Sequence, residues 1–448
     1  MRALRLAVAF TVAVSSWGLA MGAGCDSGSP SATEPHDGGG EAETSNQGLD
    51  GSSPDRGAAE SGSGRDSAST RIDTIDAGDE ATPAALDSGQ PEADAGAPCL
   101  FETRTDPHHC GTCGNDCDGG ACEAGSCVPL PSDVLASGQD GPAGIAVDAT
   151  DVYWINRYAS SAMGPTPGSQ IMKCAKSGCA NNPTMLASGS WAGTAKLVVD
   201  ATSVYWTASG LVLKCAVGGC NNQPTVLWSA QGGDQVADIA LDANNVYFSD
   251  SSTWQVLGCA VGGCNGSPTL LWSGVSSSNI PAGIAVDATT LYFSANGALF
   301  TCGAGSCNST LKQLLVNQSP ATQIAVDGTN VYFNSANSGA TGLLLTCKKT
   351  DCGNGPTILV SGLTNALGIA IDAAALYFTE LGNAGTSAQG VGRVAKCAIA
   401  GCNNSPTAIA GYVNAPVGVA VDGTYVYWTD SGSSPTAIGD GRVMKRAK

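Results

Sequence analysis

The sequence is poor in the side chains that most often carry out catalysis. Of its 448 residues only three are histidines (His36, His108 and His109), and only 13% are charged. After residue 128 the chain has no histidine and a single glutamate, Glu380. A Ser-His-Asp triad or a histidine general base is therefore excluded from that part of the chain.

Basic residues and long apolar runs are also scarce. Residues 1–128 contain no lysine and hold 21 acidic residues against 6 arginines, whereas residues 129–448 hold 17 acidic residues against 14 basic ones. The net charge of −18 therefore belongs mostly to the N-terminal part. No basic stripe could follow a phosphate backbone, so we expect no nucleic-acid partner. No later segment is apolar for 18 residues or more, which argues against a second membrane span.

Residues 1–25 have the pattern of an export signal. Arg2 and Arg5 precede a short apolar stretch at 6–14, and small residues then lead to Cys25. This segment resembles the lipobox of bacterial lipoproteins, which implies that Cys25 carries a lipid, although Gly22 stands where that family usually has leucine. Ordinary cleavage that leaves Cys25 unlipidated is the alternative. We expect an exported protein at the cell surface, at the outer membrane or in the periplasm, in contact with the membrane only through a lipid anchor.

Residues 26–98 are rich in Ser, Gly, Ala, Asp and Glu and contain scarcely any large apolar side chain. Such a composition cannot bury enough surface to offset the entropy of ordering. We predict a disordered acidic linker that acts as a tether.

Residues 99–128 form a cysteine-rich module that is too poor in apolar residues to build a core. Its six cysteines are Cys99, Cys110, Cys113, Cys117, Cys122 and Cys127. An even count in an exported chain favours three disulfides, and the sequence leaves their connectivity open. The alternative is a zinc-type site, because His108 and His109 lie beside Cys110-x-x-Cys113. The spacing resembles short modules of secreted myxobacterial proteins.

One sequence unit occurs seven times between residue 129 and the C-terminus. It reads "GIAVDATDVYW" in its first copy and "GVAVDGTYVYW" in its last, at spacings of 40 to 52 residues. Each unit offers four short apolar or β-branched runs separated by turn formers, and 60 glycines in the chain favour loop-rich β structure. Seven such units predict an all-β, seven-bladed β-propeller over 129–448.

The last unit ends without its fourth strand. A matching segment, "PSDVLASG" at 131–138, instead precedes the first unit and is similar to "PTMLASG" at 183–189. We therefore predict circular closure, in which the N-terminal strand completes the last blade and removes an exposed edge.

The tetrad Tyr427-Trp428-Thr429-Asp430 resembles the repeat of YWTD propellers, and "GIAVD" is similar to NHL-type propellers. The resemblance covers about 300 residues and implies a propeller with a binding role. The chain departs from the YWTD receptors in having seven units and internal cysteine pairs.

Six of the units carry a Cys-x4-Cys pair on the expected turn between their third and fourth strands. The pairs are Cys174 and Cys179, Cys215 and Cys220, Cys259 and Cys264, Cys302 and Cys307, Cys347 and Cys352, and Cys397 and Cys402. We predict a disulfide within each pair. Two-ligand metal sites fail on count, because a closed zinc site needs four ligands.

Repetition weighs against catalysis, since a residue that recurs in every blade is most simply structural. The repeated aspartate is read as a turn cap and the repeated aromatic pair as packing between blades. We expect no catalytic residue, metal or cofactor, and a monomeric binding propeller at the cell envelope whose partner is a protein, peptide or glycan. The alternatives are a structural envelope protein and a metal-dependent hydrolase of the lactonase-like propeller type.

Loop length gives the one asymmetry that points to a binding surface. The loops at 155–170, 379–392 and 429–441 are long and belong to blades one, six and seven, which are neighbours in a closed ring. Loops on a rigid scaffold are where binding usually resides. This predicted lip holds Arg157, Tyr158, Glu380, Asp430 and Asp440, a set suited to a polar ligand.

Overall fold

The computed structural model describes residues 103–112, 117, 120–128 and 132–448, apart from gaps at 160–167, 192–195, 209, 231–235, 276–279, 317–320, 336–341, 354, 383–391 and 433–438. The described residues form strands and turns, and none of them builds a helix long and apolar enough to cross a membrane. Residues 1–98, with Cys25 and the acidic linker, lie outside this description, as do Cys99 and Cys113. The export signal, the lipidation and the tether therefore stay predictions.

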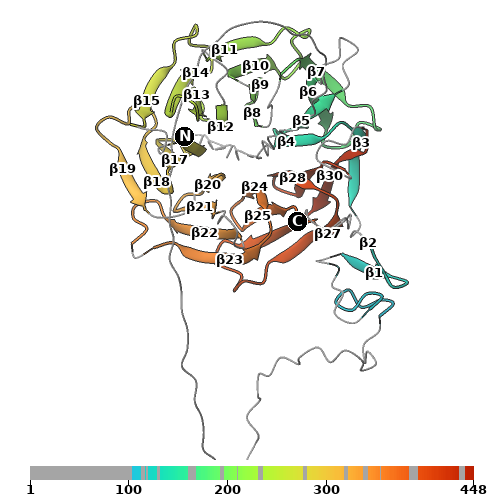
Figure 1. Cartoon of the computed structure of the whole chain (residues 1–448). Coiled ribbons are helices and arrows are strands. Elements are labelled where there is room, and N and C mark those ends of the chain that lie inside the picture. The colour runs from blue at the N-terminus through green and yellow to red at the C-terminus, as the bar shows by residue number, and fades with distance from the viewer. Residues whose placement is uncertain are drawn as a thin grey trace, which may run out of the picture. The chain divides into compact units, whose positions relative to one another are not determined.

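Seven four-stranded antiparallel sheets stand around a ring, so the predicted all-β, seven-bladed propeller is confirmed (Figure 1). In each blade the first strand lies innermost and the fourth outermost. Blade 1 holds β4 (Pro142–Val147), β5 (Asp151–Ala159), β6 (Gly168–Ala175) and β7 (Thr184–Gly189). Blade 2 holds β8 (Leu197–Val199), β9 (Ser203–Ala208), β10 (Leu211–Ala216) and β11 (Thr225–Ser229). Blade 3 holds β12 (Val236–Leu241), β13 (Asn245–Asp250), β14 (Gln255–Ala260) and β15 (Thr269–Ser273).

The remaining blades follow the same order. Blade 4 holds β16 (Pro281–Val286), β17 (Thr290–Ala295), β18 (Ala298–Gly303) and β19 (Lys312–Leu315). Blade 5 holds β20 (Ile324–Val326), β21 (Asn330–Ser335), β22 (Gly342–Lys348) and β23 (Thr357–Leu363). Blade 6 holds β24 (Ala366–Ile371), β25 (Ala375–Glu380), β26 (Gly392–Ala398) and β27 (Thr407–Val413). Blade 7 holds β28 (Pro416–Val421), β29 (Tyr425–Asp430), β30 (Gly441–Ala447) and β3 (Asp133–Gln139).

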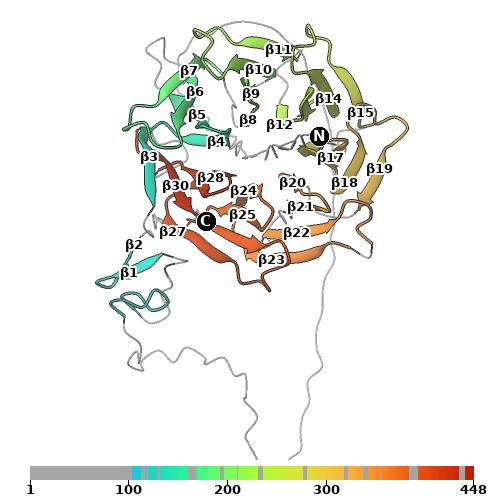
Figure 2. The same ribbon diagram turned by 180° about the vertical axis from the view of Figure 1, so that it is seen from behind.

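The ring is closed by a strand from the other end of the domain. Strand β3 pairs antiparallel with β30, with Asp133 opposite Lys445 and Gln139 opposite Gly441. Figures 1 and 2 show the two strands side by side from both directions, teal beside red. The predicted circular closure is therefore present, and it pairs an edge of β30 that would otherwise be open.

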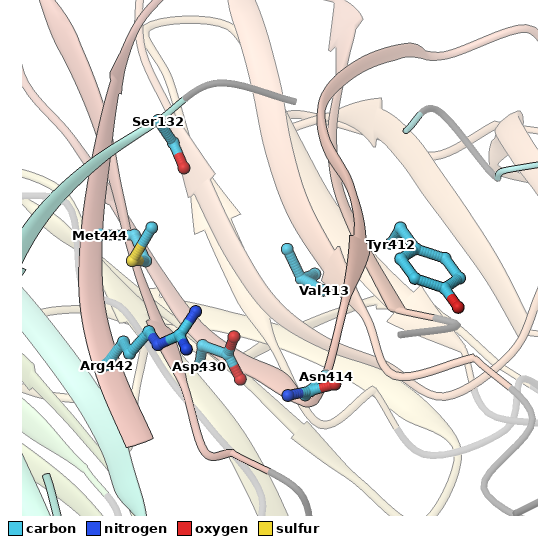
Figure 3. Close-up of a pocket in the computed structure, with 7 residues that line it drawn as sticks. All are labelled: Ser132, Tyr412, Val413, Asn414, Asp430, Arg442 and Met444. Carbon is cyan, nitrogen blue, oxygen red and sulfur yellow. The ribbon is translucent and has the colours of Figure 1, made fainter. Parts of the chain in front are cut away.

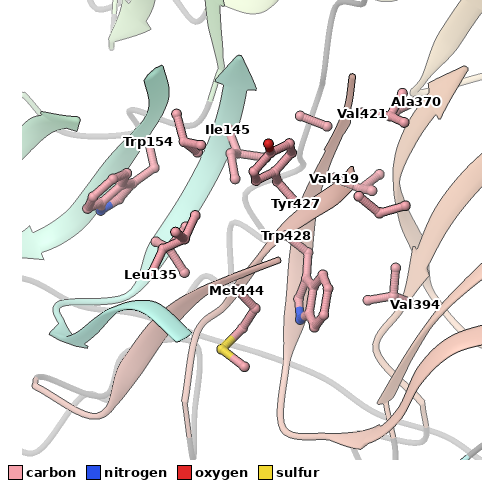
Figure 4. Close-up of a cluster of buried hydrophobic side chains, with 14 of the residues drawn as sticks. Leu135, Ile145, Trp154, Ala370, Val394, Val419, Val421, Tyr427, Trp428 and Met444 are labelled. Atoms are coloured by element: carbon pink, nitrogen blue, oxygen red, sulfur yellow. The ribbon is translucent and has the colours of Figure 1, made fainter. Parts of the chain in front are cut away.

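The hydrophobic core lies between blades. The repeated tyrosine and the aromatic residue after it alternate across the second strand, so one ring faces each neighbouring blade. The second aromatic is fully buried in every blade, as in Trp154, Phe248 and Trp428. Around blade 7 the side chains of blades 6, 7 and 1 form one continuous cluster, which joins Val394, Val419, Trp428 and Ile145 (Figure 4). The predicted packing role of the aromatic pair is confirmed.

A polar latch joins the innermost strands of several neighbouring blades. In blade 7 the Thr429 Oγ1 accepts a hydrogen bond from the Gly418 N–H at 2.9 Å and donates one to the Ala143 carbonyl of blade 1 at 2.7 Å. Thr379 makes the same two bonds to Gly368 and to Val417 of the next blade. A Cβ on Gly418 would lie 2.6 Å from the Ala143 oxygen, so glycine is what allows these strands to approach.

The six blade disulfides form as predicted, each at the turn between the third and fourth strands. In the cysteine-rich module, β1 (Ala121–Glu123) pairs with β2 (Ser126–Val128), and disulfides join Cys110 to Cys122 and Cys117 to Cys127. The sulfurs of Cys110, Cys117 and Cys127 lie within 4.8 Å of one another, but all three are bonded in disulfides. Cys110 is therefore not available for the predicted zinc-type site, and Cys113 lies outside the described residues. Eight disulfides among the described residues indicate an oxidising compartment outside the cytoplasm.

Candidate functional site

The strand order gives the ring two different faces. The turns between first and second strands and the cysteine hairpins lie on one side, which we call the hairpin face. The loops between second and third strands and the connections between blades lie on the other, which we call the loop face. The predicted lip belongs to the loop face.

Most of the three long loops lies in the gaps at 160–167, 383–391 and 433–438, but their ends are described. Arg157 is half-buried near the end of β5, and its Nε donates to the Gly141 carbonyl at 3.4 Å. Tyr158 lies in β5, although its side chain is outside the described part. Asp440 is exposed just before β30. The lip as a continuous surface stays a prediction.

The Glu380 side chain is buried, and both of its carboxylate oxygens are bonded within the protein. It is the last residue of β25 and only 7% exposed. Its Oε2 lies 2.7 Å from the Arg393 Nε, and its Oε1 accepts a hydrogen bond from the Thr364 N–H at 2.6 Å. These bonds fix the exit of the blade 6 loop and leave the glutamate little capacity to bind a ligand.

Asp430 lines a cavity of about 240 Å³ beside blades 6 and 7, which we call the Tyr412 pocket (Figure 3). The lining consists of Ser132, Tyr412, Val413, Asn414, Asp430, Arg442 and Met444. Tyr412 and Val413 end the outer strand of blade 6, and the last three residues come from β29 and β30 of blade 7. The pocket thus combines an amide, a carboxylate and a guanidinium, all groups that recognise polar ligands, whereas the Tyr412 ring points away from them (Figure 3).

Of the two charged groups in the pocket, Asp430 is held by hydrogen bonds, whereas Arg442 has no ion-pair partner among the described residues. The Asp430 Oδ1 accepts from the backbone N–H groups of Ala415 at 3.3 Å and Gly432 at 3.0 Å. Arg442 lies directly opposite Asp430 in the pairing of β29 with β30 and is exposed. Among the described residues Arg442 has no ion-pair partner within 4.0 Å, so its guanidinium is available for a bidentate contact.

Tyr412 has an unusual backbone conformation for an aromatic residue, with φ of 54°. The same position in the outer strands of blades 5 and 7 is glycine, Gly362 with φ of 80° and Gly138 with φ of 67°. A bulky residue in the left-handed region costs about 1–3 kcal/mol relative to an unstrained one. The repeat therefore calls for glycine here, and blade 6 carries a strained tyrosine at the mouth of a polar pocket instead.

The innermost strands contain a second group of departures that the sequence analysis missed. The glycine that precedes the "IAVD" element in blades 1, 4, 6 and 7 is replaced by Lys196 in blade 2, Asp238 in blade 3 and Gln323 in blade 5. All three side chains are buried, and the Lys196 Nζ lies 3.6 Å from an Asp238 carboxylate oxygen. Burial lowers the pKa of Lys196 to about 8, although the Asp238 charge opposes this shift. Comparison of the seven copies, position by position, would have exposed these three residues.

The repeated aspartates take the structural role that the sequence predicted. In every blade the aspartate Oδ1 accepts from backbone N–H groups of its own turn, as Asp148 does from Thr150 and Asp151 at 2.7 Å. The Oδ2 accepts from the tyrosine hydroxyl five residues later, at 2.7 Å for Tyr153. The tyrosine partner was not foreseen, because the aromatic pair was interpreted as packing alone.

No protein-family model and no curated protein matches the sequence. Among solved structures, a nidogen/laminin complex is similar over 51% of this chain and 85% of its own, with 18% identity and a TM-score of 0.39. A computationally designed protein, Ika8, covers 69% and 98% with 12% identity and a TM-score of 0.42. A protein assigned as TolB from Agrobacterium tumefaciens covers 60% and 94% with 13% identity and a TM-score of 0.40. At such low identities and TM-scores these likenesses say nothing about what this chain binds.

Proposed function

We propose that this chain is an exported, non-catalytic binding propeller of the cell envelope, and that the Tyr412 pocket on blades 6 and 7 is its ligand site. The observation that carries the proposal is Tyr412 itself. A residue that is strained where its repeat equivalents are glycine persists when it serves a purpose other than stability. Tyr412 lines the edge of the pocket that holds Arg442, Asp430 and Asn414, and we infer that its outward-pointing ring contacts the part of the ligand that lies outside the pocket.

The composition of the pocket indicates the class of ligand. Arg442 suits a carboxylate or another oxyanion, Asp430 suits a donor, and Asn414 both donates and accepts. A cavity of about 240 Å³ takes one side chain or one sugar ring rather than a whole cofactor. We therefore favour an extended ligand, a peptide or glycan of the envelope, that inserts one polar group here and crosses the rest of the loop face.

The experiment compares Tyr412→Gly and Arg442→Gln with the natural chain on arrays of defined envelope peptides and glycans. Tyr412→Gly restores the residue of the repeat, so the variant should fold and gain about 1 kcal/mol or more in stability. Ligands that the natural chain retains should bind both variants at least about tenfold more weakly, whereas Lys396→Gln, which removes a charge outside the pocket, should bind unchanged. If Tyr412→Gly binds every retained ligand as the natural chain does, the pocket is not the site.

A further inference from the structure

A second cavity, of about 700 Å³, lies on the hairpin face between blades 4 and 5. We call it the threonine cavity. Its walls are the first turns of the two blades, at Asp287–Thr290 and Gly328–Thr329, and their third strands and hairpins. It shares no residue with the Tyr412 pocket.

The wall of the cavity in blade 4 lacks a lysine that other blades carry. The third-strand residue opposite the repeated tyrosine is a lysine in blades 1, 2, 6 and 7, and in blades 2 and 7 this lysine bridges to the next blade. The Lys214 Nζ donates to the Val261 carbonyl at 2.6 Å, and the Lys445 Nζ donates to the Lys176 carbonyl at 2.9 Å. In blade 4 this residue is Thr301, which is too short to make such a bridge. Blades 3 and 5 also lack the lysine, with Gly258 and Thr346 at this position, so no lysine bridge crosses from blade 4 to blade 5 as one does at blades 2 and 7.

The cavity carries an excess of positive charge. Lys349 is neutralised, because its Nζ lies 2.7 Å from the Asp287 Oδ2 and above the Tyr292 ring. Lys312, directly opposite Thr301 in the sheet, and Lys348 both line the cavity and are exposed. Within the described part of the chain neither has an ion-pair partner. Two cations in a concave wall are placed to hold an anionic group.

The rest of the described lining is rich in hydroxyl groups and contains no large aliphatic side chain. Five threonines contribute to it, namely Thr290, Thr301, Thr310, Thr329 and Thr350. The single aromatic residue, Tyr292, is buried and lies under Lys349, so it offers no surface on which a ligand could stack. Protein and peptide partners are usually held by buried aromatic or aliphatic anchors, and this cavity has no place for one.

We propose that the threonine cavity is a second binding site, and that it takes an acidic oligosaccharide. Carboxylate or sulfate groups of the sugar meet Lys312 and Lys348, and its hydroxyls exchange hydrogen bonds with the threonines. The volume lies within the range of small-ligand sites. The proposal is independent of the Tyr412 pocket, because the two cavities lie on different blades.

The test is calorimetric titration of the full exported chain with trigalacturonate, the neutral galactose trisaccharide and a hexaglutamate peptide. Trigalacturonate should bind, the neutral sugar at least about tenfold more weakly, and raising the salt from about 0.05 M to about 0.5 M should weaken the acidic sugar further. The double variant Lys312→Gln/Lys348→Gln should lose at least about tenfold in affinity, with Lys396→Gln as the matched control.

Three outcomes would overturn the proposal. One is no detectable binding of trigalacturonate, another is equal binding of the double variant, and the third is binding of hexaglutamate as tight as that of the acidic sugar, which would identify an acidic-peptide site instead. Both lysines are exposed, so the double variant should keep the thermal unfolding midpoint of the natural chain. A loss of affinity with an unchanged midpoint is therefore specific to the cavity.

Discussion

The repeated aspartate divides its two oxygens between local and neighbouring structure. In blade 7 the Asp422 Oδ1 accepts from the Thr424 and Tyr425 N–H groups, and the Oδ2 accepts from the Tyr427 hydroxyl at 2.8 Å. Lys176 of blade 1 adds an ion pair at 2.8 Å. Burial acts to raise the pKa of Asp422, but these bonds outweigh it and lower the pKa to about 2. Burial and the bond to Asp422 raise the pKa of Tyr427 well above its ordinary value.

Removal of the lysine should make this balance visible as a function of pH. The pKa of Asp422 is lower in the folded state than its ordinary value of 3.8, so its stabilising contribution is complete above about pH 4 and is lost as the pH falls towards 2. We predict that Lys176→Met lowers the free energy of unfolding by a constant amount above about pH 4, and that the difference shrinks towards pH 2. Urea denaturation of both proteins across this range measures it. A difference that does not vary with pH would assign the role of Lys176 to its stacking on the Tyr427 ring instead.

For single residues, the sequence predicted which positions are structural better than it predicted their hydrogen-bond and ion-pair partners. The turn-capping role of the aspartates follows from their place between two β-branched runs, which any antiparallel hairpin would share. The tyrosine lies on the next strand of the same unit, where its hydroxyl bond was overlooked because the ring was interpreted as packing alone. The lysine comes from another blade, so one copy of the repeat does not indicate it. Tyr412 and Lys196 could have been found, because each occupies a position where other blades have glycine.

At the scale of elements, the innermost strands of neighbouring blades are joined by the side-chain hydroxyl of a serine or threonine, and only some of the blades have such a bond among their described residues. The latch position holds Ser249, Ser294, Thr379 and Thr429 in blades 3, 4, 6 and 7, and each donates to a backbone carbonyl of the next blade. In blade 1 the residue is Ile155, and in blade 2 it is Thr207, whose Oγ1 has no hydrogen-bond partner among the described residues. The strands and turns were predictable from short-range pattern, whereas the latch depends on how closely two blades approach.

This difference between blades gives a matched pair of substitutions. Thr429→Val keeps the shape of the side chain but leaves the Gly418 N–H and the Ala143 carbonyl without their partner at the junction of blades 7 and 1. We predict a loss of about 1–3 kcal/mol in the free energy of unfolding, measured by guanidinium denaturation. Thr207→Val removes a hydroxyl that makes no hydrogen bond within the described part of the chain, so its effect should stay within about 0.5 kcal/mol. Equal effects of the two substitutions would contradict the latch.

At the scale of the whole molecule, the closed ring was predictable because the missing strand is visible in the sequence. The seventh unit has no fourth-strand segment after it, and the segment "PSDVLASG", which resembles a fourth strand, precedes the first unit. Seven copies with one shared blade leave a single way to pair every strand. The faces and their cavities were not predictable in the same way, because blades differ there in single side chains, such as Thr301 for lysine or Tyr412 for glycine.

The closure itself can be tested by removal of the strand that makes it. A chain lacking residues 129–139 loses β3, and with it Leu135 and Ala136, which are buried in the same cluster as Trp428 and Met444. The exposed edge of β30 then offers unpaired N–H and C=O groups to other chains. We predict a lower unfolding temperature and oligomers or aggregates on size-exclusion chromatography, whereas removal of eleven residues from the acidic linker, 41–51, should leave a monomer of natural stability. A synthetic peptide of residues 129–139 added in trans should restore the monomer, because it supplies the missing strand without changing any other contact. If the shortened chain is instead a monomer with the unfolding temperature of the natural protein, β3 does not hold the ring closed.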